Sequence, residues 1–377
     1  MYPLKTILGS RKTIVLKIGT TLLADKVQGV NADRIAALST SVARLKTLGY
    51  QVVIVSSGAI GAGMGVLHLN ERPRTIPEKQ AAAAIGQPIL MEAYERAFRQ
   101  QHCIIAQILL TKDDFVNRSR YLNIKNTFAA LFRKGVVPVI NENDSVSVEE
   151  IKLGDNDNLS ALVSNLIEAG LLIILSDVDG LYSDDPAKNT KATLIPVVER
   201  ISPQIEKLAK ERKSELSTGG MITKLEAAKR CTSSGIAVII TNGARPGVIE
   251  EIVSGRPAGT LFVPQSTRLS VRKKWIGFVS DSRGAVVVDE GARGAVLKKQ
   301  KSLLPSGVLE IRGDFNVRDT ISVFDLSGNE IARGVSGYSS AELDKVKGKK
   351  TEEILKILSR DGTEVIHRNN LVLTGIE

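Results

Sequence analysis

The sequence predicts an α/β protein of two domains: a three-layer αβα sandwich built on a mainly parallel sheet, and a small C-terminal β-rich domain. Over residues 1–264, short runs rich in Val, Ile and Leu alternate with longer segments of helical apolar spacing. The runs are apolar throughout, as expected of strands that helices cover on both faces. After residue 276 the chain changes to short strand-like pieces separated by Gly and Asp.

Six apolar runs are the expected strands of the sandwich: Thr13–Ile18, Gln51–Val55, Ile104–Leu110, Val136–Ile140, Leu171–Leu175 and Ala237–Thr241. Five segments between them have the length and spacing of crossover helices: Ala32–Leu48, Pro77–Gln100, Tyr121–Lys134, Asn158–Ala169 and Lys224–Ser234. Strands and helices that alternate in this order favour a doubly wound parallel sheet.

The second domain is expected to follow a linker. Residues 265–275 are polar and basic, which separates a first domain at 1–264 from a second at 276–377. A helix is predicted over Ser339–Lys347, because Ser339 and Glu342 can form a capping box. The expected strands of this domain are Ala285–Val288, Val308–Ile311, Ile321–Phe324 and Glu330–Val335.

Composition excludes several classes of protein. Hydrophobic residues make up 43% and charged residues 24% of the 377, as in folded globular proteins. Two cysteines and three histidines are too few for a disulfide framework or a His- or Cys-rich metal centre. The sequence has no apolar stretch of about 18 residues and no apolar signal core at its start, so we expect a cytoplasmic protein without a membrane partner.

The net charge of +10 lies entirely in the first domain, because residues 277–377 carry 15 Lys and Arg against 15 Asp and Glu. An RNA-binding second domain would need a local cationic surplus and aromatic stacking platforms, and aromatic residues are only 4% of the chain. Nucleic acid is therefore a disfavoured partner.

Small polar residues follow most of the predicted strands, as in Ser56-Ser57-Gly58, Asn141–Asp144, Ser176–Gly180 and Asn242-Gly243. Any one of these segments could be an ordinary turn. The carboxyl ends of parallel strands meet at one edge of a sheet, so four such segments together favour a ligand crevice there. The usual nucleotide motifs are missing: no P-loop occurs, and the glycines of Gly58–Gly65 do not have the dinucleotide spacing.

Three local features indicate phosphate chemistry. Lys17 lies between apolar residues at the end of a strand, where it is either a cation for a phosphoryl group or a strand-end lysine that reaches solvent. Gly154–Asn158 packs acceptors at the start of a helix, and capping explains only one of its two aspartates. Thr218–Lys224 is a glycine-rich loop that enters a helix, where Lys224 opposes the helix dipole unless an anion binds.

These residues resemble the glutamate 5-kinases, a branch of the amino acid kinase family. The resemblance covers nearly the whole chain, and Trp275–Lys301 is similar to the start of a PUA domain. The segments that carry the similarity are Val15–Thr21, Val55–Gly61, Asn141–Asp144, Lys152–Leu159, Asp177–Tyr182 and Thr218–Lys224.

The resemblance implies the amino acid kinase fold and ATP-dependent phosphorylation of the γ-carboxylate of L-glutamate, the first step of proline biosynthesis. It implies that Lys17 and Lys224 stabilise the transferring phosphoryl group and that Asp157 holds both lysines. Glutamate would bind to Ser57, Asp144 and Asn156. The ATP site would comprise Lys17, Ser176, Asp177, Thr218, Gly219, Gly220, Met221, Ile222, Thr223 and Lys224.

The family further implies Mg²⁺, with ligands unknown and the ion held mainly by ATP phosphates. It also implies feedback inhibition by proline, a homodimer or homotetramer, and contact with glutamate-5-semialdehyde dehydrogenase.

Two alternatives stay open on the residues alone. Sister kinases that act on aspartate, N-acetylglutamate, carbamate or a nucleoside monophosphate share the sandwich and the lysine pair, and only the resemblance separates them. A catalytically inactive regulator would be expected to lack Lys17, Asp157 or Lys224, and all three are present.

Overall fold

The structure is a computed structural model that describes most of the chain. The described residues are 7–9, 11–25, 29–146, 155–186, 188–210, 220–256, 258–265, 282–299, 301–349, 353–354, 357 and 364–374. The chain forms two compact units, Met1–Thr267 and Arg268–Glu377. Of the predicted linker 265–275, only Gln265 lies inside the described residues.

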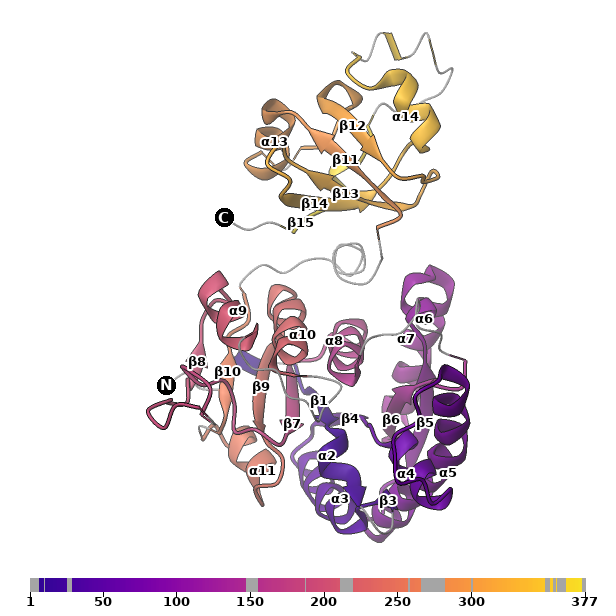
Figure 1. The fold of residues 1–377 in the computed structure, drawn as a ribbon, viewed down its shortest axis with the longest axis vertical. Helices are drawn as coiled ribbons and strands as arrows, with labels where there is room; N and C mark the ends of the chain where they lie inside the picture. Colours follow the sequence, from indigo (N-terminus) through magenta and orange to yellow (C-terminus); the bar gives the residue numbers. More distant parts are fainter. Residues whose placement is uncertain are drawn as a thin grey trace. The chain divides into compact units, whose positions relative to one another are not determined.

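The first unit is built on an eight-stranded sheet of order β5-β6-β4-β1-β7-β9-β10-β8 (Figure 1). The six predicted strands are confirmed within two residues at each end, and every pairing among them is parallel. The sequence did not predict the short strands β8 and β10, of which β10 runs antiparallel to β9. The strands are β1 (Thr13–Ile18), β4 (Gln51–Val55), β5 (Ile105–Leu110), β6 (Val137–Glu142), β7 (Leu171–Ser176), β8 (Val197–Val198), β9 (Ala237–Asn242) and β10 (Thr260–Phe262).

Helices cover both faces of this sheet, which makes the predicted three-layer sandwich (Figure 1). One face carries α3 (Ala32–Thr47), α4 (Ala59–Val66), α5 (Ile76–Gln100) and α11 (Val248–Val253). The other carries α7 (Arg118–Arg133), α8 (Asn156–Leu166), α9 (Pro203–Lys210) and α10 (Met221–Ser233). The remaining elements of the unit are α2 (Thr20–Leu23), α6 (Lys112–Val116), β2 (Ala24–Asp25) and β3 (Gly29–Val30).

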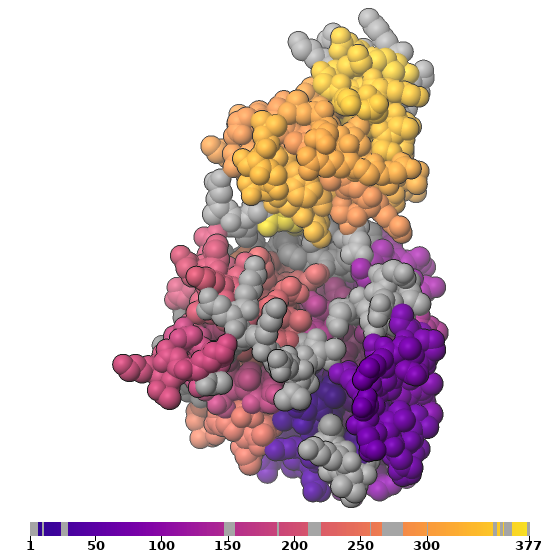
Figure 2. Space-filling model, viewed as in Figure 1, coloured from indigo at the N-terminus to yellow at the C-terminus, as the bar shows by residue number. Residues whose placement is uncertain are grey.

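The strand order places a topological switch at β1. Strands β4, β5 and β6 lie on one side of β1, where the chain reaches the edge strand β5 before it forms β6 between β5 and β4. The chain then crosses to the other side of β1 and forms β7 and β9. Figure 2 shows the two halves as purple and pink-to-orange surfaces on either side of the first unit. In open α/β sheets, ligands bind beyond the carboxyl ends of the strands next to such a switch. The functional site is therefore expected at the carboxyl ends of β1, β4 and β7.

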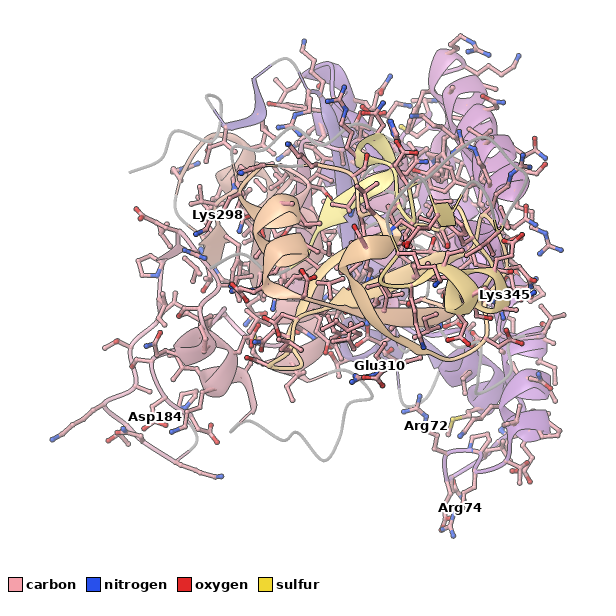
Figure 3. All side chains as sticks on the ribbon, turned by 90° about the horizontal axis from the view of Figure 1, so that it is seen from above. Arg72, Arg74, Asp184, Lys298, Glu310 and Lys345 are labelled. Carbon is pink, nitrogen blue, oxygen red and sulfur yellow. The ribbon has the colours of Figure 1, made fainter. Side chains whose placement is uncertain are left out.

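The glycine run after β4 forms the helix α4, which packs closely against α5. A Cβ atom added to Gly63 would lie 1.8 Å from the carbonyl oxygen of Ala82, and one added to Gly86 would lie 1.9 Å from that of Ala59. The glycines therefore allow two helix backbones to touch. Beyond this contact, Figure 3 shows Arg72 and Arg74 pointing outward from the loop that joins α4 to α5.

The second unit contains a five-stranded sheet of order β12-β11-β13-β14-β15. The four predicted strands and the capped helix α14 are confirmed; the Ser339 hydroxyl accepts a hydrogen bond from the Glu342 backbone at 3.2 Å. Helix α13 and strand β15 were not predicted. The elements are β11 (Gly284–Val288), α13 (Glu290–Leu297), β12 (Val308–Arg312), β13 (Thr320–Phe324), β14 (Glu330–Val335), α14 (Ser340–Val346) and β15 (Leu371–Leu373), with single 3-10 turns at Pro305–Gly307 and Arg368–Asn370. Among the described residues of both units, no helix is long and apolar enough to cross a membrane.

The contact between α4 and α5 gives a test on one helix. We expect Gly63→Ala to lower the free energy of unfolding by about 1–3 kcal/mol, because its methyl group would overlap the backbone of α5. Gly61→Ala, two residues earlier, meets open space and is expected to raise it by up to about 1 kcal/mol, since alanine favours helix. Denaturant unfolding measures both, and equal effects of the two substitutions would contradict the packing described.

Candidate active site

A buried carboxylate between two ammonium groups lies beside the switch point. Asp157 Oδ1 is 2.6 Å from Lys17 Nζ, and Asp157 Oδ2 is 3.1 Å from Lys224 Nζ. The Asp157 side chain is fully buried, and the lysine side chains are only 8% and 7% exposed. Three distant parts of the sequence thus meet at one carboxylate.

Lys17 reaches this position because it is the penultimate residue of β1, the central strand. It pairs in register with Val55 of β4 on one side and with Ile174 of β7 on the other. The alternative of a strand-end lysine that reaches solvent is wrong, since the side chain turns to Asp157 instead. A buried ammonium group needs such a partner to offset its loss of hydration.

Asp155, Asn156 and Asp157, at the start of α8, each make different contacts. Asp155 is the N-cap residue, and its Oδ1 accepts hydrogen bonds from the backbone N–H groups of Asp157 and Asn158, both at 3.0 Å. Capping therefore explains Asp155. The sequence predicted that capping would explain only one of the two aspartates. Asp157 holds the lysines, and Asn156 turns toward the loops after β4 and β6.

Lys224 lies in the first turn of α10, where the helix dipole disfavours a cation. Asp157 supplies the anion that offsets this cost. Thr223 strengthens the arrangement, because its hydroxyl donates to Asp157 Oδ2 at 3.0 Å. Two neighbouring residues of α10 are thus tied to one carboxylate of α8.

The two aspartates of this turn have opposite pKa shifts. Burial on its own would raise the pKa of Asp157, but the charges of Lys17 and Lys224 hold it below the ordinary value. The pKa of Asp155 is raised, mainly by burial and to a smaller extent by repulsion from the charge of Asp157. The ionised form of Asp157 is therefore the stable one, and it keeps both lysines in place.

A hydrogen-bonded cluster of loop residues lies on the β4 and β6 side. The Nδ2 group of Asn156 shares its two protons among three acceptors: the Ser56 carbonyl at 2.7 Å, Ser57 Oγ at 2.8 Å and Asn141 Oδ1 at 3.2 Å. The buried atoms Asp155 Oδ2, Asn156 Oδ1 and Asn158 Oδ1 accept no hydrogen bond from the described residues. Unsatisfied buried acceptors of this kind fit a ligand that brings donors, such as an ammonium group.

On the opposite side, the loops after β7 and β9 are joined to each other. Ser176 donates to Asp177 Oδ1 at 2.9 Å, and Asn242 of β9 donates to Asp179 Oδ1 at 3.1 Å. Gly220 is the N-cap residue of α10, and Met221, Ile222 and Thr223 form its first turn.

The remaining predicted site residues are Asp144, Thr218 and Gly219. Asp144 is half-buried in the turn after β6, three residues beyond Asn141, which lies near the end of that strand. Thr218 and Gly219 lie outside the described residues. In the parts of the chain that the structure describes, no group of three or more His, Cys, Asp or Glu side chains could hold a metal ion.

Asn141, Gln87 and Tyr94 were not predicted as site residues. Asn141 Nδ2 donates to Gln87 Oε1 of α5 at 2.9 Å, and the Tyr94 hydroxyl lies 3.0 Å from Ser56 Oγ. Asn141 belongs to a polar loop that the sequence marked, which could have suggested it. Gln87 and Tyr94 carry no such signal, because they lie inside an ordinary amphipathic helix.

The carboxylate of Asp157 gives a test of the site's stability. We expect Asp157→Asn to lower the free energy of unfolding by about 3–5 kcal/mol, because two buried ammonium groups lose their countercharge. A carboxylate with a depressed pKa stabilises the fold above its ordinary pKa of about 4, and that contribution is lost as the pH falls below it. Wild-type protein should therefore lose more stability than the variant between about pH 5 and about pH 2.

The matched control is Asp113→Asn, at an exposed position in the first turn of α6, which should change stability by no more than about 0.5 kcal/mol. Denaturant unfolding at several pH values measures both variants. Equal stability of the Asp157 and Asp113 variants would contradict the role given to Asp157.

Comparison with known proteins agrees with this geometry. The family model of the amino acid kinase family matches residues 12–242, and that of the PUA domain matches residues 284–358. The chain is 47% identical to a glutamate 5-kinase of Moorella thermoacetica, over 98% of either chain. It is 50% identical to that of a Thermoanaerobacter species, over 96% of this chain and 97% of the relative. It is also 49% identical to that of Syntrophotalea carbinolica, over 98% and 99%.

The kinase match spans every strand and helix that brings Lys17, Asp157 and Lys224 together, and the named relatives extend over both units. From this similarity and the site's geometry, the chain belongs to the glutamate 5-kinases of the amino acid kinase family.

Proposed function

We propose that this enzyme transfers the γ-phosphoryl group of ATP to the γ-carboxylate of L-glutamate, which yields L-glutamyl 5-phosphate for proline biosynthesis. The observation that carries the proposal is the pair of buried lysines on one carboxylate at the switch point of the sheet. Similarity to named glutamate 5-kinases over nearly the full chain supports the choice of acceptor.

The chemistry needs charge stabilisation more than acid–base catalysis. A carboxylate acceptor is already an anion at neutral pH, so no general base has to remove a proton from it. The barrier includes its repulsion from the ATP phosphates, and cations that face the transferring group lower that barrier. In the proposal Lys17 and Lys224 are those cations, and Asp157 fixes both ammonium groups before substrates arrive.

Glutamate is proposed to bind at Ser57, Asp144 and Asn156, on the β4 and β6 side of the site. The buried, unsatisfied oxygen of Asn156 and the neighbouring acceptors of Asp155 and Asn158 suit the ammonium group of an amino acid. The hydroxyl of Ser57 already accepts from Asn156, so its own proton is available for a substrate oxygen.

ATP is proposed to bind on the β7 and β9 side, at Ser176, Asp177 and the segment 218–224. The start of α10 supports this, because free backbone N–H groups at a helix start bind phosphate. We propose that Mg²⁺ enters with ATP and is held mainly by phosphate oxygens. The ion commonly takes few protein ligands when phosphates are present, and Asp157 is engaged by both lysines.

We further propose inhibition by proline near the glutamate site, a homodimer or homotetramer, and contact with glutamate-5-semialdehyde dehydrogenase. A cytoplasmic location is part of the same proposal. These proposals rest on the resemblance to the glutamate 5-kinases.

Substrate choice is tested by ADP release from Mg-ATP with L-glutamate, L-aspartate or N-acetylglutamate, each with and without L-proline. Of the three acids, we expect only glutamate to support turnover, and we expect proline to suppress it. Because the acyl phosphate product is unstable, hydroxylamine is added to trap it as a hydroxamate. Turnover only with another acid would overturn the acceptor and leave the phosphoryl-transfer chemistry in place. No turnover from folded protein with any acid would refute the kinase proposal.

The role of the lysines is tested by Lys224→Ala. We expect kcat to fall by about 10²–10³, since one charge-stabilising donor is lost while Asp157 stays paired with Lys17 and the fold persists. The matched control is Lys229→Ala on the same helix, an exposed residue paired with Glu206 at 2.6 Å, which should keep kcat within about twofold. Near-normal turnover of the Lys224 variant would remove Lys224 from the mechanism.

A further inference from the structure

Helix α5 touches the proposed glutamate site through side chains that no part of the phosphoryl-transfer proposal uses. Tyr94 lies in the third quarter of α5 and is completely buried. Its hydroxyl oxygen is 3.0 Å from Oγ of Ser56, which is also completely buried. A phenylalanine would fill the same apolar space, so the hydroxyl group needs an explanation beyond packing.

The direction of this hydrogen bond follows from the contacts of Ser56. The Ser56 hydroxyl donates to the carbonyl oxygen of Ser57 at 3.2 Å, and a hydroxyl has only one proton. When that proton is directed to the Ser57 carbonyl, Tyr94 is the donor and Ser56 Oγ is the acceptor. Burial raises the pKa of Tyr94 even though the bond to Ser56 opposes that shift, so the phenol stays protonated and remains a donor.

Ser56 also fixes the residues expected to face the substrate. Its backbone N–H donates to the Ile140 carbonyl at 2.8 Å, and its own carbonyl accepts from Asn156 Nδ2 at 2.7 Å. The same Nδ2 group donates to Ser57 Oγ at 2.8 Å. With Nδ2 directed to these acceptors, Oδ1 of Asn156 is a buried oxygen that accepts no hydrogen bond from the described residues.

We propose that Tyr94 is a positioning residue for the acceptor substrate: through its hydrogen bond to Ser56 it sets the Ser57 loop and the orientation of the Asn156 amide. Tyr94 is closed to solvent, so it cannot contact the substrate itself, and its hydroxyl reaches the proposed site through the contact with Ser56. The inference deepens the proposed function and rests on it, because Ser57 and Asn156 are the residues proposed to bind glutamate.

The variant Tyr94→Phe tests this with the full-length enzyme. We expect KM for glutamate to rise about three- to tenfold, the effect of one lost hydrogen bond, while kcat and KM for ATP stay within about twofold. The lysines and Asp157 are untouched by the change, so only the acceptor side should respond. A merely structural effect would instead move the KM for glutamate and the KM for ATP together.

Tyr121→Phe is the matched control. Tyr121 is also buried in the first unit, with 2% exposure, but it lies on α7. Besides burial, the charge of Glu168, which follows the C-terminal end of α8, contributes to raising the pKa of Tyr121. The same loss of a phenol hydroxyl there should leave KM for glutamate unchanged.

A double-mutant cycle with Ser56→Ala isolates the bond itself. If Tyr94 acts through Ser56, the double variant has the same KM for glutamate as the more affected single variant. If the fold changes in KM for glutamate of the two single variants multiply in the double variant, the proposal is overturned. An unchanged KM for glutamate in Tyr94→Phe, or equal changes in the KM values for glutamate and ATP, would also overturn it.

Failure of the proposed function is recognised separately. Wild-type enzyme without glutamate turnover would refute glutamate as acceptor before any variant is compared. The cycle would then be run with whichever carboxylate the enzyme accepts, and the same KM pattern would support or overturn the role of Tyr94.

Discussion

The rest of the site depends on one buried ion pair network, in which Asp157 holds Lys17 and Lys224 within 2.6 and 3.1 Å. This carboxylate offsets the cost of burying both ammonium groups, because an uncompensated charge in a protein interior is strongly destabilising. The three residues lie on β1, α8 and α10, so the packing of these elements fixes the spacing of the cations. Cations that are held before substrate binds need little reorganisation when charge develops on a transferring phosphoryl group.

The parallel sheet turns this network into a site with two sides. Strands β4 and β6 bring the Ser56-Ser57 and Asn141–Asp144 loops to one side of β1, and β7 and β9 bring polar loops to the other. Asn156 and Asp157 are adjacent in sequence, yet Asn156 faces the first side while Asp157 faces the lysines. The start of α8 thus joins the proposed acceptor site to the two lysines that are proposed to stabilise the phosphoryl group, and α5 contacts the acceptor site through Tyr94 and Gln87.

Much of the fold was predictable from the sequence, because buried parallel strands leave unbroken apolar runs and their crossover helices are long. Elements that the sequence analysis did not predict include short or atypical ones: β10 has three residues, and α4 is a glycine-rich helix that packs closely against α5. The placement of Lys17 and of Lys224 each indicated an anionic partner, and only the resemblance implied that Asp157 holds both lysines; the structure shows the two ion pairs. Tyr94 could not be found at all, since a buried tyrosine in a helix has the same pattern as a core residue.

We propose that the lysine pair stabilises the transferring phosphoryl group more than it stabilises bound ATP. The most direct measurement compares, in wild type and Lys224→Ala, the dissociation constant of ATP with that of ADP and aluminium fluoride in the presence of glutamate, a mimic of the transition state. We expect the variant to lose about 10²-fold or more in affinity for the mimic and far less in affinity for ATP. Equal losses for both ligands would contradict it, because Lys224 would then be a binding residue only.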